Sequence, residues 1–256
     1  MANADNAPQM SVRGLTRRFG GLVAVNNVDL DLHQGEVHAV IGTNGAGKST
    51  LINMLSGEIA ASSGSIALEG RDVTQMPQPQ RAKAGIGRSY QRTTIFPEFT
   101  VLENCRLTAQ AQALPRPWRI WESAQHCATS MQRAQSALQR AGLDQHAGRI
   151  AGSLSHGAKR QLEVAMCLAT APRVLLLDEP LAGMGAEETE RMLELLQELK
   201  SAHAVLLVEH DMDAVFRIAD RITVMVNGSV VATGTPDQIR NDPVVRTAYL
   251  GEEEHA

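Results

Sequence analysis

The segment GTNGAGKST, residues 42–50, fits the pattern G-x-x-x-x-G-K-[ST] at every position. Its glycines let the backbone bend so that successive N–H groups point inward at a phosphate, and a helix that begins here adds its positive end. The pattern predicts that Lys48 reaches the β- and γ-phosphates of a nucleotide and that Ser49 offers its hydroxyl to Mg²⁺. An ordinary glycine turn between a strand and a helix is the alternative. The candidate nucleotide-binding residues are Gly42, Thr43, Asn44, Gly45, Ala46, Gly47, Lys48, Ser49 and Thr50.

Two carboxylates follow an apolar run later in the chain. Residues 174–177 read VLLL, and Asp178 and Glu179 come next. Asp178, at the end of a predicted strand, is placed to bind the same Mg²⁺ as Ser49, and Glu179 could polarise the water that attacks a phosphate. An apolar strand that ends in Asp-Glu is common, and its role is about as often structural as functional. The assignment therefore depends on the phosphate-binding pattern upstream.

The elements that must position these residues are predicted from apolar periodicity. Residues 37–41 read as a strand that stops at Gly42, and residues 49–56 read as a helix. Strand, glycine-rich loop and helix thus occur in the order that phosphate binding requires. A hairpin turn is expected at Asn227-Gly228. Further strands are expected at residues 23–32, 65–69, 174–177, 204–208, 222–226 and 230–233.

The middle of the chain is predicted to be helical. Residues 101–143 are rich in Ala, Gln, Leu and Arg, and one face of an amphipathic helix carries Met131, Ala134, Leu138 and Ala141. A second clear helix is expected at 187–200. The expected organisation is a flexible leader at 1–10, a single domain at 11–251 with a helical subdomain at about 93–170, and a tail at 252–256.

Composition and charge exclude several classes of protein. The apolar fraction of 43% excludes a disordered chain, and the net charge of −4 gives no electrostatic footprint for wrapping nucleic acid. The first ten residues lack the basic start and apolar core of a signal peptide. Apolar runs are far shorter than the ~20 residues that span a bilayer. We therefore expect a cytoplasmic chain that reaches a membrane only through a partner.

The cysteines predict thiols and not a cross-linked framework. Cys105, Cys127 and Cys167 are odd in number, and each lies in a stretch with a helical pattern. For these reasons they are expected to be small, buried or half-buried thiols in a reducing compartment and not a disulfide or zinc framework.

From Met10 to Gly251 the sequence resembles the ATP-binding cassette (ABC) ATPase family. Besides the two motifs above, LSHGA at 154–158, followed by KRQLEVAMCLA, looks like the signature segment of that family. The resemblance implies an α/β P-loop NTPase fold of the ABC-ATPase type, with a RecA-like core, an antiparallel β subdomain and an inserted helical subdomain. It also implies that Ser155 and Gly157 bind the γ-phosphate of ATP held by a second subunit. A plain N-capping serine is the alternative for Ser155.

Three further family positions carry over onto this sequence. Phe19 sits where an aromatic side chain stacks on adenine, although a core phenylalanine is about as consistent with the sequence alone. Gln91, in SYQRTTIF, matches the glutamine that senses Mg²⁺ and the water and links to the transmembrane partner. His210, in LLVEHDM, matches the switch histidine that contacts the γ-phosphate, with an ordinary surface histidine as the alternative. The candidate catalytic residues are thus Glu179, His210 and Gln91, and the candidate metal ligands are Ser49, Gln91 and Asp178.

The sequence departs from the family pattern at the signature and after the second carboxylate motif. His156 stands where the first glycine of the signature is usual, and Ala158 stands where glutamine is usual. Gly185 stands where the family usually has an aspartate that communicates across the dimer. The last departure puts the symmetry of coupling between two sites in doubt and leaves nucleotide binding untouched.

Within the family, the chain looks most like ATPases of the high-affinity branched-chain amino-acid uptake systems, which also include urea and amide importers. The segments that carry this resemblance are ENCRLTAQAQ, EPLAGMGAEE, EHDMDAVFRIADRITVM and VVRTAYLG. It implies an ATPase that uses ATP and Mg²⁺ and forms a homo- or heterodimer with a second ABC ATPase. The dimer would lie on the inner face of the cell membrane on two transmembrane permease subunits, and would serve a periplasmic substrate-binding protein indirectly.

Two alternatives stay open from the sequence. A urea or amide importer is the nearest one. A soluble ABC ATPase that acts on nucleic acid or the ribosome is a different class, but such proteins usually carry a long coiled coil, zinc ligands or two cassettes, and the charge is wrong for a nucleic-acid surface.

The function of Trp118 and Trp121 is also open. They could face a membrane subunit or pack the helices of the insert.

Overall fold

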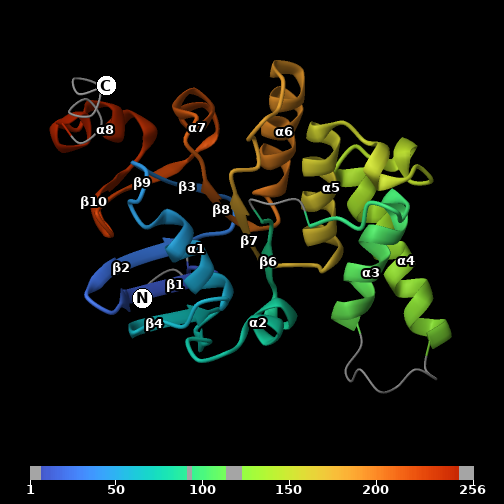
Figure 1. Ribbon diagram of the computed structural model, residues 1–256, viewed down its shortest axis with the longest axis horizontal. Coiled ribbons are helices and arrows are strands. Elements are labelled where there is room, and N and C mark those ends of the chain that lie inside the picture. The colour runs from blue at the N-terminus through green and yellow to red at the C-terminus, as the bar shows by residue number, and fades with distance from the viewer. Residues whose placement is uncertain (1–6, 91–93, 114–122, 248–256) are drawn as a thin grey trace.

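The computed structural model describes residues 7–90, 94–113 and 123–247. Its larger sheet has the strand order β10-β9-β3-β8-β7-β6 (Figure 1). Strand β10 closes one edge as the antiparallel partner of β9, and the other strands are parallel. The expected strands of this sheet are confirmed, and only the three-residue β6 is too short for periodicity to predict. The strands are β3 (Val37–Gly42), β6 (Ile86–Arg88), β7 (Val174–Asp178), β8 (Ala204–Val208), β9 (Arg221–Val226) and β10 (Ser229–Gly234).

Apolar residues on both faces of the larger sheet hold helices against it. Along β7, Val174 and Leu176 belong to one core, whereas Leu175 and Leu177 belong to another. A parallel sheet that is covered on both faces needs such near-continuous apolar strands. One face packs against α1 (Lys48–Ser56), and the other against α6 (Ala186–Leu199), α7 (Met212–Ile218) and α8 (Pro236–Asn241). A further helical turn follows at 243–247.

A smaller antiparallel sheet shares the core that contains α1 (Figure 1). Its strand order is β2-β1-β4-β5. The hydroxyl of Thr74, which follows β5, accepts a hydrogen bond from the N–H of Ile66 at 2.8 Å and so fixes the end of this sheet. The elements of this part are β1 (Met10–Phe19), β2 (Leu22–Leu32), β4 (Ser63–Leu68), β5 (Arg71–Asp72) and the short helix α2 (Gln78–Ala84).

Strand β1 is an element that simple alternation did not predict. Its buried apolar residues Met10, Val12 and Leu15 are spaced by two and then by three. The pairing with β2 shifts register between Val12 and Leu15, and Gly14 has a φ of 57° there. An extra residue in one strand is a β-bulge, and it breaks the period of two. Gln9 also donates its N–H to the carbonyl oxygen of Leu32 at 2.8 Å, so the sheet begins within the segment expected to be a leader.

Three helices form a lobe beside the larger sheet (Figure 1). The predicted apolar face is present, because Ala134, Leu138 and Ala141 are buried and Met131 is half-buried. The lobe shares one continuous core with β7 and α6. Its helices are α3 (Val101–Ala113), α4 (Ser123–Arg140) and α5 (His156–Ala169), with 3₁₀ turns at Asp144–His146 and Ala151–Ser153.

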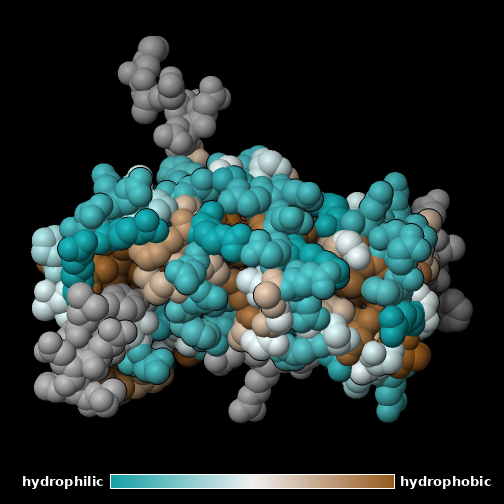
Figure 2. Space-filling view, turned by 90° about the horizontal axis from the view of Figure 1, so that it is seen from above, coloured by the Kyte–Doolittle hydropathy of each residue, from teal (hydrophilic) through white to brown (hydrophobic). Residues whose placement is uncertain are grey.

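The surface is mainly polar. In Figure 2 hydrophilic residues cover most of the visible face, and hydrophobic residues occupy smaller areas between them. Phe96 and Phe99 are exposed exceptions, with ring centroids 5.6 Å apart. Among residues 7–90, 94–113 and 123–247, no helix has both the length and the apolar character needed to cross a bilayer. Trp118 and Trp121 lie outside the described residues.

Two of the three thiols lie in the interior, as predicted. Cys105 and Cys167 are free and buried. Burial raises the pKa of each thiol to about 12. The side chain of Cys127 lies outside the described part of the structure.

We predict that Cys105 and Cys167 do not react with a disulfide reagent at pH 8 while the chain is folded, because the thiolate is the reactive form. The measurement is the absorbance of the released thiol in a Cys127→Ser variant, before and after unfolding in urea. Both thiols should react after unfolding, and rapid reaction of the folded protein would contradict the burial.

Candidate active site

The residues predicted to do chemistry gather at one edge of the larger sheet. Strands β3, β8 and β7 are parallel, and both Val40 and Asp178 pair with Val208 of β8. The carboxyl ends of these strands therefore lie level with one another. The glycine-rich loop leaves β3, Asp178 ends β7, and His210 comes two residues after β8. Ligands of open α/β sheets bind at this edge.

The backbone around the glycine-rich loop leaves no room for side chains at two places. A Cβ at Gly42 would lie 2.2 Å from the carbonyl oxygen of Met225, and a Cβ at Gly47 would lie 2.3 Å from that of Ala24 on β2. Gly45 and Gly47 also have φ values of 79° and 98°, in the region that favours glycine. Packing against β2 and β9 thus requires some of the glycines that the sequence pattern assigns to phosphate binding.

The turn between β9 and β10 supports the loop from outside. The N–H of Gly228 donates to the carbonyl oxygen of Ala46 at 3.0 Å, and the carbonyl oxygen of Gly228 accepts from the N–H of Asn26 at 2.8 Å. The loop is therefore clamped between β2 and the predicted Asn227-Gly228 turn.

Lys48 begins α1 and extends its ammonium back over the loop. Its Nζ donates to the carbonyl oxygens of Gly42 at 2.6 Å and Thr43 at 3.0 Å. Burial lowers the pKa of Lys48, and the charges of Glu179 and Asp178 oppose that change. The ammonium and the N–H groups at the start of the helix form a positive cradle for an anion. Asn44, Gly45 and Ser49 are exposed, Thr43 and Thr50 are half-buried, and Ala46 is buried.

Asp178 is a buried carboxylate close to two cations. Burial raises its pKa, while the charges of Arg88 and Lys48 lower it and the charge of Glu179 raises it. Its N–H donates to the hydroxyl of Ser89 at 3.2 Å. The Asp178 carboxylate and the Ser49 hydroxyl are oxygen donors of the kind that Mg²⁺ prefers, and Mg²⁺ sites commonly use one or two carboxylates together with phosphates. These residues therefore fit a Mg²⁺ site.

Glu179 turns sharply away from the line of β7. Its φ is 49°, which is uncommon for a residue other than glycine. Its N–H donates to the carbonyl oxygen of Val208 at 2.9 Å. The Nδ1 of His210 lies 3.9 Å from Oε1 of Glu179, and the His210 side chain is 66% exposed. The structure thus brings two of the three predicted catalytic residues, Glu179 and His210, close together at the carboxyl ends of β7 and β8.

Glu209 is a buried residue that is not one of the predicted site residues. One carboxylate oxygen accepts the N–H of Leu181 at 2.9 Å, and the other accepts the N–H of His210 at 3.2 Å. Burial raises the pKa of Glu209, while these hydrogen bonds lower it. Glu209 therefore holds the loop after Glu179 against the loop that carries His210. The only signal for Glu209 in the sequence was its position directly after the apolar strand predicted at 204–208.

Gln91 lies outside the described residues, but helix α5 holds the chain on either side of it. Arg160 donates to the carbonyl oxygen of Tyr90 at 2.9 Å, and Glu163 accepts the N–H of Thr94 at 2.8 Å. The two side chains also form an ion pair at 2.9 Å. Helix α5 is therefore bound to the chain on both sides of Gln91. The role of Gln91 itself stays a prediction.

The predicted signature residues form a second group. Ser155 caps α5 by accepting the N–H of Ala158 at 3.2 Å, and its hydroxyl donates to Glu188 of α6 at 2.8 Å. A Cβ at Gly157 would lie 2.2 Å from the carboxylate carbon of Glu188. Within the described residues, no hydrogen bond links Ser155 or Gly157 to the glycine-rich loop.

The two departures from the family pattern lie beside this group. The Nε2 of His156 lies 3.1 Å from the carbonyl oxygen of Ala182, and a Cβ at Gly183 would touch the same ring at 2.9 Å. Gly185 caps α6, and its N–H donates weakly to Glu188 at 3.4 Å. The signature and the segment after Glu179 are therefore joined within one chain.

Phe19 is exposed at the end of β1, so the alternative of a core phenylalanine is wrong. The residue is 43% exposed. The guanidinium of Arg17 lies 4.5 Å from the ring centroid. An exposed ring of this kind can stack on a base.

We predict that Gly47→Ala destabilises the protein by about 2 to 5 kcal/mol, combining about 1–2 for the left-handed backbone and about 1–3 for the clash with β2. Gly45→Ala is the matched control, because nothing lies within 4 Å of its Cβ position; it should lose only the backbone part, about 1–2 kcal/mol. Urea unfolding without nucleotide measures both losses. Equal losses would contradict the clamp on the loop.

Comparisons with known proteins agree with this geometry. The model of the ABC transporter family matches residues 25–182, and the model for branched-chain amino acid ATP-binding cassette transporters matches residues 229–255. The high-affinity branched-chain amino acid transport ATP-binding protein LivG of Escherichia coli (strain K12) is 44% identical, over 96% of this chain and 98% of LivG. The protein BraF of Pseudomonas aeruginosa, which has the same description, is 41% identical, again over 96% of this chain and 98% of BraF.

Solved structures show the same fold. A nucleotide-free ATP-binding cassette from an ABC transporter has a TM-score of 0.83 and 29% identity, over 94% of this chain and 98% of the other. An ABC transporter cassette in its ADP conformation has a TM-score of 0.83 and 28% identity, over 95% and 99%. The expected α/β P-loop NTPase fold is thereby confirmed. This chain belongs to the ABC transporter family and is one of its ATPases.

Proposed function

We propose that this chain is the ATP-binding and ATP-hydrolysing subunit of an importer that takes up branched-chain amino acids or a related small solute through partner permeases. The observation that carries the enzymatic part is the meeting of Lys48, Asp178, Glu179 and His210 at one sheet edge. LivG and BraF, which are named for branched-chain amino acid transport, support the transport part.

Each candidate site residue then has a role. The N–H groups of the glycine-rich loop and the Lys48 ammonium bind the β- and γ-phosphates, and the exposed ring of Phe19 stacks on adenine. Mg²⁺, when bound by Ser49 and Asp178, supplies positive charge that stabilises the phosphates. Glu179 accepts a hydrogen bond from the attacking water and orients it. His210 contacts the γ-phosphate from its position beside Glu179, and Gln91 completes the water and metal contacts.

The other half of each site comes from a second ABC ATPase. Ser155 and Gly157 lie at the N-terminal end of α5, where the free N–H groups and the helix dipole favour an anion. We propose that they bind the γ-phosphate of ATP held by the opposite subunit. A homodimer or a heterodimer with a related ATPase would satisfy this arrangement.

Transport requires partners that this chain does not contain. We propose that the dimer lies on the inner face of the cell membrane against two permease subunits, and that a periplasmic substrate-binding protein delivers the solute to them. The solute then never touches this chain. The relatives named above are transport proteins, which favours this function over action on nucleic acid or the ribosome.

We predict that Glu179→Gln lowers ATP hydrolysis by about 10²-fold or more, because the water loses its base. ATP should still bind, and the variant should accumulate as an ATP-bound dimer. Steady-state phosphate release and size-exclusion chromatography with ATP measure the two effects. Lys48→Ala is the control, since it should lose phosphate binding and stay monomeric. A Glu179→Gln variant that hydrolyses ATP at the normal rate and stays monomeric would rule out the composite site.

We predict that deletion of this gene in its native host lowers uptake of leucine, isoleucine and valine and leaves urea uptake unchanged. Radiolabelled uptake at low solute concentration measures both. Wild-type protein should restore the lost uptake, and Glu179→Gln should not. Loss of urea uptake with normal leucine uptake would assign the chain to a urea importer.

A further inference from the structure

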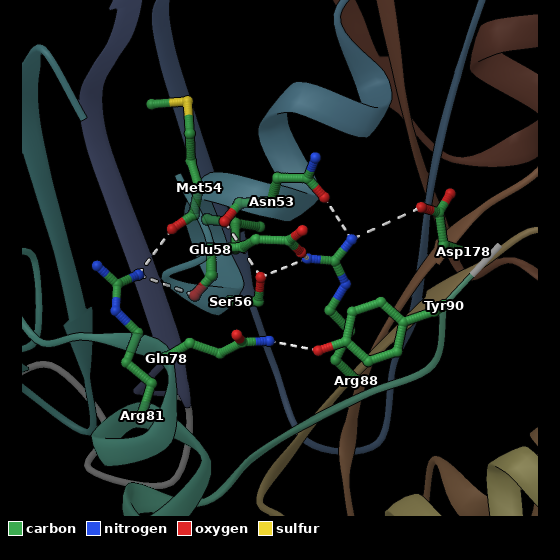
Figure 3. Close-up of polar contacts among 10 residues, drawn as sticks. Asn53, Met54, Ser56, Glu58, Gln78, Arg81, Arg88, Tyr90 and Asp178 are labelled. Carbon is green, nitrogen blue, oxygen red and sulfur yellow. Dashed lines mark hydrogen bonds and ion pairs between the residues drawn. The ribbon is translucent and has the colours of Figure 1, made fainter. Parts of the chain in front are cut away.

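Arg88, the last residue of β6, places a buried guanidinium between α1 and β7 (Figure 3). Its side chain is 8% exposed. Nη1 donates to the hydroxyl of Ser56 at 2.6 Å and to Oε2 of Glu58 at 2.7 Å. Nη2 donates to the side-chain oxygen of Asn53. These contacts fix the guanidinium to the last turn of α1 and to the residue that follows Gly57.

The same guanidinium also faces the carboxylate of Asp178. Nη2 lies 4.0 Å from Oδ2 of Asp178, whose side chain is 6% exposed. The ring of Tyr90 lies 4.7 Å from the guanidinium carbon and holds it from another side. Arg88 therefore joins α1, which begins next to Ser49, to the residue that ends β7.

This position matters because the two proposed Mg²⁺ donors lie on different elements. Ser49 is on α1, and Asp178 is on β7. Mg²⁺ demands near-ideal octahedral geometry at about 2.0–2.1 Å, so a small shift of α1 against β7 would misplace one donor. The planar fork of arginine can hold several oxygen acceptors at fixed angles at once.

We infer that Arg88 is a positioning residue for Mg²⁺ binding: it sets the Asp178 carboxylate relative to Ser49 by bridging β7 and the end of α1. The inference rests on the proposed function, because that function makes Ser49 and Asp178 the metal donors. Arg88 itself does not touch nucleotide or metal in this arrangement.

A neighbouring arginine shows what a purely structural role looks like. Arg81 is also buried, but its guanidinium donates to backbone carbonyl oxygens, those of Met54, Leu55, Thr74 and Met76. Arg81 thus closes the end of α1 without facing a carboxylate of the site (Figure 3). Arg81→Lys is therefore a matched control that perturbs the same end of the helix.

The test measures metal binding directly, with Mn²⁺ as the probe. The purified chain, in excess over a non-hydrolysable ATP analogue, is titrated with Mn²⁺, and free Mn²⁺ is followed by electron paramagnetic resonance. Arg88→Met should weaken Mn²⁺ binding by about 10- to 100-fold, as loss of an outer partner of a metal ligand commonly does. Binding of the analogue in EDTA should change by less than about 2-fold, because the loop and Lys48 are intact. Arg88→Lys should recover part of the Mn²⁺ affinity, and Arg81→Lys should keep all of it.

Each other outcome decides against the inference or against its premise. If Arg88→Met binds Mn²⁺ as tightly as wild type, or loses metal and analogue affinity by the same factor, Arg88 is only structural. If Arg88→Met does not fold, Asn53→Ala removes the anchor of the same Nη2 and should weaken Mn²⁺ binding several-fold; unchanged affinity there overturns the inference. If wild-type protein binds the analogue but adds no Mn²⁺ affinity to it, the proposed metal site fails first.

Discussion

The parallel hydrogen bonding of β7 to β8 and of β8 to β3 is the constraint on which the site depends. Because Val40 and Asp178 both pair with Val208, three strands end at the same level. The chain after each strand then places a different group in the same region. The glycine-rich loop follows β3, Asp178 and Glu179 lie at the end of β7, and His210 follows β8. These strands are apolar on both faces, and their alternate residues pack into the two cores that contain α1 and α6.

Burial of charge at this edge has a cost that the surrounding residues offset. Asp178 lies in a setting that favours its neutral form, and the nearby cations Arg88 and Lys48 act against that tendency. Glu209 and Glu163 have the same difficulty and are stabilised by backbone N–H groups. A buried charge that is fully hydrogen-bonded keeps its neighbours in one arrangement. The loops that follow Glu179 and Val208 are thus held together by the buried carboxylate of Glu209.

The sequence predicted those parts of the site whose residues are adjacent along the chain. Residues 42–50 are recognised by their own spacing, and Asp178 and Glu179 by the apolar run that precedes them. The structure places both motifs at the carboxyl ends of parallel strands. Arg88 could not be predicted in this way, because Asn53, Ser56 and Glu58 lie 30 or more residues away along the chain. Glu209 had only its place after an apolar strand as a signal, and its contact with Leu181 spans 28 residues. Strand β1 was hidden by a bulge, and the exposure of Phe19 depends on how that strand ends. The contact between Ser155 and Glu188 likewise joins segments separated by 33 residues.

The clamp around the glycine-rich loop has a consequence for nucleotide binding. At Gly47 and Gly228 three chain segments touch so closely that neither position has space for a methyl group. Because β2 also pairs with β1, the strand that ends at Phe19, the glycine-rich loop and Phe19 are connected through one sheet. In the proposed function, the phosphates and the adenine of one nucleotide would therefore contact the same packed unit of the chain at two places.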